Sequence, residues 1–190
     1  MTARPAILAL LLLLGCTTFR PVKDQAVRHL LEPLAPDRSL AASTPAIAIG
    51  RVALPEYLDD EHLVTRRDGV LEISGLDQWA EPLDTSVARV IAANLSRSTG
   101  SMNIQPVGRF TSLDYTHLLE LRISRFDPDE SGALLLQGTW RLQPVSGGEA
   151  RNRFFRILAP IQEPVSDAKN RVKAMNQALL QLSREIAASR

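Results

Sequence analysis

Cysteine, aromatic residues and excess charge of either sign are all scarce in this sequence. One of its 190 residues is a cysteine, so no disulfide can form within the chain. Lysine and arginine number 22 against 21 aspartates and glutamates, so no overall field favours nucleic acid as a partner. With 5% aromatic, 45% hydrophobic and 23% charged residues, the composition indicates one compact domain and excludes a disordered chain or a multipass membrane protein.

Long hydrophobic runs are also missing. The run near the N-terminus covers residues 6–14 and consists of nine apolar residues, six of them leucine. A membrane-spanning helix needs about 20 such residues, so this run is typical of a secretory signal peptide, which we place at residues 1–15. Its removal takes Arg4 away and leaves 21 basic side chains, 22 less one, against 21 acidic ones.

The single cysteine follows this run directly. Leu13, Leu14 and Gly15 precede Cys16, an order that resembles the bacterial lipobox. The resemblance implies that Cys16 becomes the first mature residue and carries a thioether-linked diacylglycerol and an amide-linked acyl chain such as palmitate. Several acyl chains make membrane attachment effectively permanent. The alternative is an idle cysteine behind an ordinary secretion signal.

The residue after the cysteine indicates in which membrane the lipoprotein is retained. Thr17 stands where an aspartate would, by analogy with enteric lipoprotein sorting, favour retention in the inner membrane. We therefore expect the protein at the periplasmic face of the outer membrane of a Gram-negative bacterium.

Prolines dominate the next segment. Residues 16–45 hold Pro21, Pro33, Pro36 and Pro45, which predicts an extended and poorly packed tether. A short strand is expected within Ala26–Leu34, before Pro33 breaks it. A single domain is predicted to follow at residues 46–190.

Period-two patterns predict the strands of this domain. A first strand opens at Ala46 with a bulge at Gly50, and Asp68-Gly69 predicts a hairpin between strands at 63–66 and 70–73. Three further strands, separated by turns at 127–132 and 146–148, are expected at residues 119–123, 134–142 and 151–158.

Two segments have helical periodicity. The first is Glu81–Ser98, with Gly100 at its end; the second enters through Pro164 and is capped by Ser166 or Asp167. Apolar residues follow each other in the second helix at spacings of three and four: Val165, Ala168, Val172, Met175, Leu179, Leu182 and Ile186. This seam predicts packing on the sheet beside the first helix or, alternatively, self-association into a homo-oligomer. The fold class is therefore α+β, with a mainly antiparallel sheet of about 5–7 strands and two helices on one face.

No pattern for bond chemistry stands out. His29, His62 and His117 lie far apart without metal-ligand spacing, and no nucleophile elbow, phosphate-binding loop or dinucleotide fingerprint occurs. Asp127 and Asp129 mimic the start of a calcium loop, but its twelfth position would be a glycine, so a turn is expected there. We predict no catalytic residue, no metal and no cofactor, and therefore no enzyme.

Several segments together resemble a known family. They are LPEYL at 54–58, VTR at 64–66, WAEPL at 79–83, Ala88-Arg89-Val90 and Asn94-Leu95, in this order and behind the lipobox. Their sequence is similar to that of the PqiC-type auxiliary lipoproteins of ABC transporters over about 140 residues, although Arg28-His29 stands where family members often have tyrosines.

The resemblance implies a role without catalysis. It suggests an outer-membrane lipoprotein that works with an MCE-domain protein, an inner-membrane permease and an ATPase to move lipid between membranes and maintain envelope integrity. The candidate partner-binding residues are Tyr57, Trp79 and Trp140, because tyrosine and tryptophan are enriched at protein interfaces; both tryptophans could instead be core anchors.

Two other functions remain open. A stand-alone periplasmic lipid-binding carrier would need an apolar cavity of at least about 300 Å³. An envelope hydrolase has no support from the residues.

Overall fold

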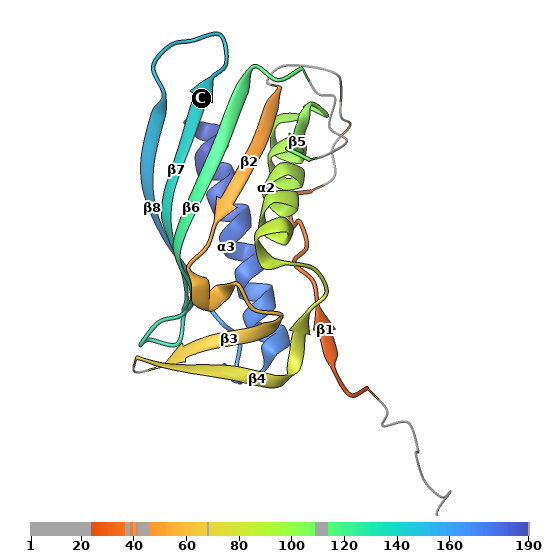
Figure 1. The fold of residues 1–190 in the computed structure, drawn as a ribbon, viewed down its shortest axis with the longest axis vertical. Helices are drawn as coiled ribbons and strands as arrows, with labels where there is room; N and C mark the ends of the chain where they lie inside the picture. The colour runs from red at the N-terminus through yellow and green to blue at the C-terminus, as the bar shows by residue number, and fades with distance from the viewer. Residues whose placement is uncertain are drawn as a thin grey trace, which may run out of the picture.

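The computed structural model describes residues 24–36, 39, 41, 46–67, 69–108 and 114–189. The expected signal peptide and the expected lipidation site Cys16 lie outside these residues, as does Asp68 in the expected hairpin turn. The described chain has the predicted α+β fold, with two α-helices and with eight strands in two sheets (Figure 1).

The larger sheet has five strands in the order β5-β2-β6-β7-β8. They are β2 (Ile47–Ala53), β5 (Ile104–Pro106), β6 (His117–Pro128), β7 (Leu134–Pro144) and β8 (Arg151–Ala159). The last three form the predicted antiparallel meander, but β2 runs parallel to both β5 and β6, so the sheet is mixed. Alternating patterns report which face of a strand is buried and not its direction, and parallel neighbours become possible through the long crossover that contains the first helix.

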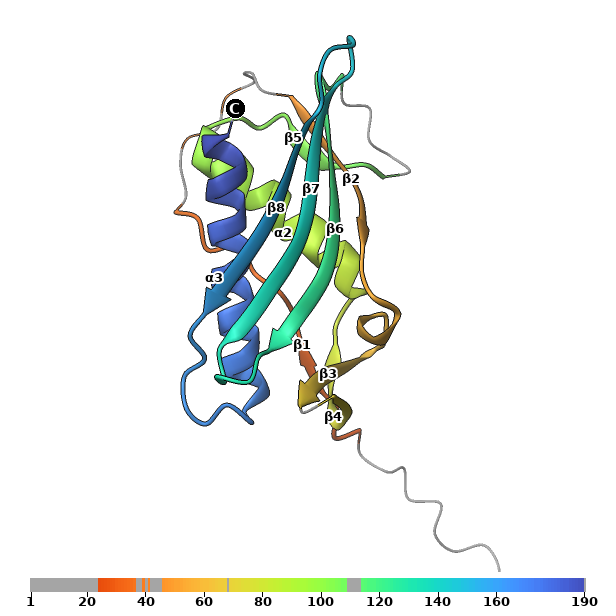
Figure 2. The same cartoon turned by 90° about the vertical axis from the view of Figure 1, so that its left-hand side faces the viewer.

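Both helices cover one face of this sheet, as predicted. Figure 2 shows α2 (Leu83–Thr99) and α3 (Ala168–Ala188) on the same side of the five strands. The seam of α3 from Ala168 to Ile186 is buried against α2, β7 and β8, and Leu179, Leu182 and Ile186 are 0% exposed. Packing on the sheet is therefore confirmed as the role of this seam.

The helix ends follow the capping rules that the sequence predicts. Gly100 ends α2 in the left-handed region, at φ 74°, where a residue without Cβ is favoured. The Asp167 side chain accepts a hydrogen bond from the backbone N–H of Lys169 and caps α3.

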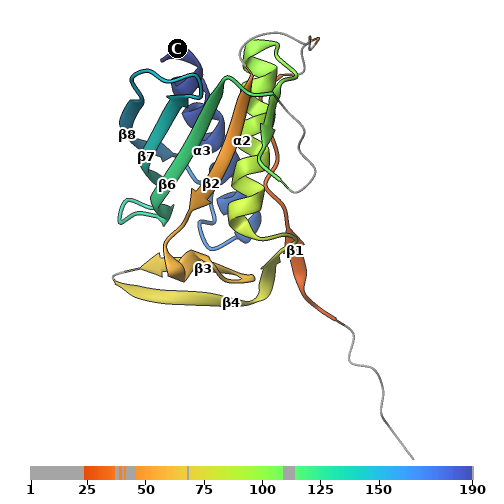
Figure 3. The ribbon, with the colours of Figure 1, turned by 45° about the horizontal axis from the view of Figure 1, so that its top comes forward.

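The smaller sheet lies at the end of the molecule opposite the C-terminus (Figures 1 and 3). Its strands β1 (Val27–His29), β4 (Val70–Trp79) and β3 (His62–Arg67) stand in that order. β3 and β4 form the expected antiparallel hairpin, whereas β1 pairs parallel with the far end of β4, so this sheet is mixed as well. A 3₁₀ turn, η1 (Glu56–Leu58), leads from β2 into this sheet.

The short strand expected within Ala26–Leu34 is confirmed as β1, but the expectation of poor packing before residue 46 is wrong for two residues that follow it. Leu31 and Ala35 are 0% and 2% exposed. Arg89 on α2 donates a hydrogen bond to the Leu31 carbonyl, and the Asn94 side chain accepts one from the N–H of Ala35. Side chains of α2 thus satisfy the backbone of a segment whose prolines prevent a longer strand.

The strand pairing of the larger sheet has two register shifts. The pairing of β2 with β6 shifts register between Ile49 and Val52, which confirms the bulge expected at Gly50, and β6 has a second shift between Ile123 and Arg125. Gly138 of β7 stands opposite Ile123, next to the second shift, and a Cβ on it would overlap the carbonyl oxygen of Arg122 and come within 2.9 Å of the Phe155 ring. A side chain at this position would push β6 and β7 apart.

Candidate functional site

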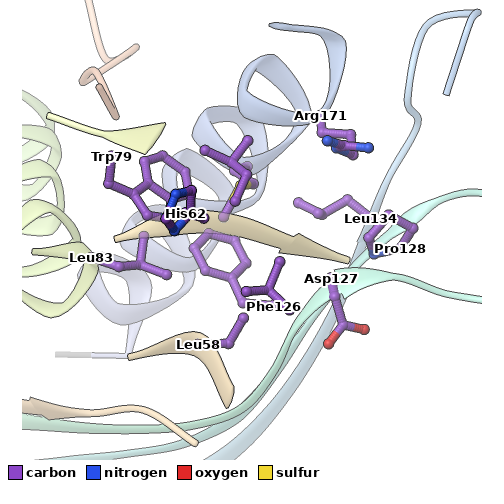
Figure 4. Close-up of a pocket in the computed structure, with 12 residues that line it drawn as sticks. Leu58, His62, Trp79, Leu83, Phe126, Asp127, Pro128, Leu134 and Arg171 are labelled. Atoms are coloured by element: carbon purple, nitrogen blue, oxygen red, sulfur yellow. The ribbon is translucent and has the colours of Figure 1, made fainter. Parts of the chain in front are cut away.

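A narrow pocket lies where the smaller sheet meets the lower end of the larger sheet and α3 (Figure 4). Its volume is about 20 Å³, and its lining is mostly apolar, with Leu58, Trp79, Leu83 and Phe126 among the residues that surround it. The candidate partner residue Trp79 is half-buried here and packs against the core. A space of this size holds about one water molecule and no lipid chain.

Tyr57 stands beside this pocket in a bonded cluster. Its hydroxyl donates to Asp127 at 2.5 Å, and Arg125 donates to the other oxygen of the same carboxylate at 2.9 Å through Nε. Asp127 is 1% exposed. Burial and the hydrogen bond to Asp127 raise the pKa of Tyr57 far above its ordinary value, so the phenol stays a neutral donor. The Tyr57–Asp127 hydrogen bond connects η1 with β6, and the Tyr57 side chain stays half-exposed.

A histidine, an aspartate and a serine meet at the junction of β1 and β4. His29 Nε2 lies 2.7 Å from one oxygen of Asp77, and Ser74 donates to the other at 2.8 Å. In a catalytic triad the histidine stands between the other two residues, whereas here the carboxylate does, so the serine has no base. Burial opposes ionisation of Asp77, but the hydrogen bonds from His29 and Ser74 outweigh it and lower its pKa.

The described residues offer no ligand set for a metal. No group of three or more His, Cys, Asp and Glu side chains comes together among them. His62 lies 3.1 Å from Asp60 and His117 lies 2.9 Å from the Thr116 hydroxyl, both near the surface. Within the same residues, no helix is long and apolar enough to cross a membrane.

The outer face of the larger sheet, which the helices leave uncovered, is hollowed and basic. The open hollow has a volume of about 640 Å³. Four adjacent strands each give it an exposed arginine, and Glu120 is the acidic residue of its lining. The arginines are Arg51 on β2, Arg122 on β6, Arg141 on β7 and Arg153 on β8. No ion pair joins these arginines to any residue in the described part of the chain. We call this surface the basic hollow.

The basic hollow also carries an exposed aromatic ring. Phe154 on β8 is 65% exposed, directly across from Thr139 of β7. The candidate Trp140, by contrast, is 3% exposed and lies in the core with Leu136 and Leu142, so it presents no ring to a partner. The period-two pattern already places Trp140 on the buried side, because it shares the parity of these two leucines.

Sequence reasoning missed the arginines of the basic hollow. Each of Arg122 and Arg141 looks like an ordinary polar residue of its own strand. The signal lies in the pairing register, which sets Arg122 opposite Thr139 and Arg141 opposite Glu120 on neighbouring strands. Such a cluster becomes visible only when the register is known.

Comparisons with known proteins agree with this architecture. Among curated proteins no relative matches the chain. The crystal structure of an uncharacterized protein is 25% identical and has a TM-score of 0.66, with 87% of this chain and 98% of that chain covered. Protein XCC0632 from Xanthomonas campestris, of the family DUF330, is 16% identical with a TM-score of 0.67, covering 85% and 93% of the two chains. The likeness to XCC0632 shows the fold alone.

A family model gives the decisive match. It describes the ABC-type transport auxiliary lipoprotein component and matches residues 29–187, a range that begins at the last residue of β1, contains every later strand and α2, and ends in the last turn of α3. The match also covers the proline-containing segment that packs on α2. This chain therefore belongs to the family of ABC-type transport auxiliary lipoprotein components.

Proposed function

We propose that this protein is a docking subunit of a lipid-transporting ABC system, held by lipid on Cys16 at the periplasmic face of the outer membrane. Membership of the auxiliary lipoprotein family supports a role beside an ABC transporter. The partner we propose is an MCE-domain protein that connects the subunit with an inner-membrane permease and ATPase.

The packing of the interior is the observation that favours docking over carrying. The narrow pocket of about 20 Å³ is far below the ~300 Å³ of a site for a lipid-sized ligand. Two larger hollows, of about 640 and 710 Å³, are open to solvent and bordered by several arginines. The stand-alone lipid carrier thus lacks an apolar cavity in the described part of the chain, and we do not favour it.

The basic hollow is the docking surface that we propose for the partner. Four exposed arginines and one glutamate line it, although the whole chain carries 22 basic against 21 acidic residues. In the register Arg122 stands opposite Thr139 and Arg141 opposite Glu120, so the guanidinium groups are staggered over strands about 4.8 Å apart. Together they form a basic cluster that suits carboxylates on an acidic partner surface. Phe154 supplies an apolar contact beside them, and Tyr57 and Trp79 remain further candidates at the lower end of the sheet.

Attachment to the membrane allows a weak contact between the docking surface and the partner to be sufficient for binding. A partner confined to the same envelope space meets the docking surface at a high effective concentration, so no large interface is needed. Replacement of Cys16 by alanine should release the protein from the membrane fraction, as measured by fractionation and by mass spectrometry of the N-terminus. A variant that stays bound would contradict the anchor.

The docking surface is tested by charge reversal. The double variant Arg122→Glu, Arg141→Glu should reduce recovery of the MCE protein in a pull-down from membrane extracts by about tenfold or more, because two attractions become repulsions. The matched control is Arg184→Glu, which reverses an exposed charge on α3, away from the hollow. Equal recovery with both variants would show that the partner binds elsewhere, and no recovery even with the native protein would contradict the proposed partner.

A further inference from the structure

Strand β4 exposes an unusual number of aliphatic side chains. Val70, Leu71, Ile73 and Leu76 are 63%, 45%, 60% and 52% exposed, within seven consecutive residues. Side chains alternate between the two faces of a strand, so Leu71 and Ile73 share one face, whereas Val70 points to the other. Single exposed aliphatic residues are common on protein surfaces, but neighbouring ones on one face mark a surface that binds something. We call Leu71 and Ile73 the β4 patch.

Arginines lie next to the β4 patch on the neighbouring strand. In the hairpin register Arg66 stands opposite Leu71 and Arg67 opposite Val70. Arg67 reaches Glu72 only at 3.8 Å, with both side chains more than half exposed, and the side chain of Arg66 has no ion pair or hydrogen bond among the described residues. Apolar residues flanked by arginines suit the boundary between acyl chains and phosphate groups, because guanidinium binds phosphate while its stem stays in apolar surroundings.

The position of β4 in the fold also favours contact with a lipid surface. β4 runs across the end of the molecule, with the larger sheet and both helices on its other side (Figures 1 and 3). β1 pairs with β4, and the described chain begins beside it at Asp24, eight positions after Cys16. Eight extended residues span at most about 28 Å, so an anchor on Cys16 keeps this end of the domain close to the membrane.

We propose that the β4 patch rests on the surface of the bilayer that holds the lipid anchor, with Leu71 and Ile73 at the acyl boundary and with Arg66 at lipid phosphates. The inference rests on the lipidation of Cys16 in the proposed function. In this orientation the strands of the larger sheet stand roughly upright on the membrane, because they run across the direction of β4 in Figure 1. The basic hollow then faces sideways and stays open to a protein partner.

Fluorescence quenching by lipids tests the contact. The lipidated protein carries no free thiol, so Ile73→Cys introduces one site for a bimane label. The labelled protein is reconstituted into vesicles of phosphatidylethanolamine and phosphatidylglycerol that contain a nitroxide-labelled lipid. We expect quenching at position 73 to exceed that at a control site by about twofold or more, because interfacial side chains reach the depth of the nitroxide. The control is Phe154→Cys, which is equally exposed but lies on β8.

Each outcome decides between the alternatives. A second reporter, Leu71→Cys, should behave like position 73, so one poorly folded variant would not decide the result. Quenching at 71 and 73 that does not exceed the value at 154, in protein that floats with the vesicles, would overturn the inference and leave the anchor intact. Changes that depend on protein concentration and not on the nitroxide lipid would assign the patch to a second copy of the chain and also overturn it. Protein that fails to float, or whose Cys16 takes up the label, would overturn the anchor and the inference together.

Discussion

The two sheets of this protein differ in how far their apolar side chains are buried. On the face of the larger sheet that the helices cover, Leu119, Leu136 and Ile157 are at most 1% exposed. In the smaller sheet, β4 leaves aliphatic side chains about half exposed or more. Both sheets are built from strand-forming sequences, so the difference arises from what covers them. Two long helices lie on the first, whereas β4 has no comparable cover among the described elements.

This difference assigns the stability of the fold mainly to the larger sheet and its helices, and a surface for interaction to β4. Burial of apolar area is the main source of folding free energy, at about 25 cal/mol per Å², so the larger sheet and its helices hold most of it. The side chains of β4 contribute little in the free protein and are available to another surface. The following experiments test this division, from the largest expected effect to the smallest.

Truncation of a buried and an exposed aliphatic side chain gives the sharpest contrast. Leu179→Ala empties a fully buried position on α3 and should lower the free energy of unfolding by about 2–5 kcal/mol. Ile73→Ala on β4 removes a side chain that is 60% exposed and should change it by less than ~0.5 kcal/mol. Urea unfolding followed by circular dichroism measures both. A large loss at Ile73 would show that β4 is part of the stability core.

Two glycines within strands offer a second contrast. Gly138→Ala places a methyl group against the Arg122 carbonyl and the Phe155 ring, which should destabilise the protein by about 1–3 kcal/mol. Gly75→Ala on β4 meets nothing within 4 Å and should have little effect or a slightly stabilising one. The same unfolding measurement applies. Equal effects of the two substitutions would contradict the tight packing of β6 on β7.

The hydrogen bond between Tyr57 and Asp127, near the place where the two sheets meet, should contribute an intermediate amount to the free energy of unfolding. Tyr57→Phe removes the hydroxyl that binds the buried Asp127 and should cost about 1 kcal/mol of stability. The matched control is Tyr115→Phe, because Tyr115 is exposed and makes no hydrogen bond with its hydroxyl among the described residues. Thermal unfolding compares the two, and a midpoint for Tyr57→Phe as high as that of the control would show that the bond contributes nothing measurable.

Local patterns in the sequence predicted every strand of the two sheets except the short β5, which no pattern indicated. The three-and-four spacing of α3, the capping residues Gly100 and Asp167 and the bulge at Gly50 depend on neighbours along the chain, and the structure confirms each of them. These signals are local because a helix cap or a bulge is decided within a few residues.

Long-range features could not be predicted in the same way. Residues 27–35 pack because Arg89 and Asn94, some 60 positions later, bind their backbone. The parallel pairing of β2 with β6 and the gathering of Arg51, Arg122 and Arg141 also depend on register between distant strands. Composition alone therefore pointed to tyrosine and tryptophan as partner-binding residues, and one of these, Trp140, is a core residue.

The smallest expected effect concerns the junction of β1 with β4, and it depends on pH. The hydrogen bonds from His29 and Ser74 hold the pKa of Asp77 below its ordinary value, which is about 3.9 in an unfolded chain. The stability that this carboxylate contributes is therefore fully present above pH ~5 and is lost as the pH falls through the folded-state value. Asp77→Asn should lower stability by up to about 1 kcal/mol at pH 6 and by progressively less toward pH ~2, because the protonated native side chain then resembles the amide. Urea unfolding across this pH range, with the exposed Glu149→Gln as the control, measures the difference between native and variant protein. A difference that does not change with pH would mean that backbone pairing alone holds β1 on β4. The strand that we propose leads to the membrane anchor would then be attached without a contribution from the Asp77 carboxylate.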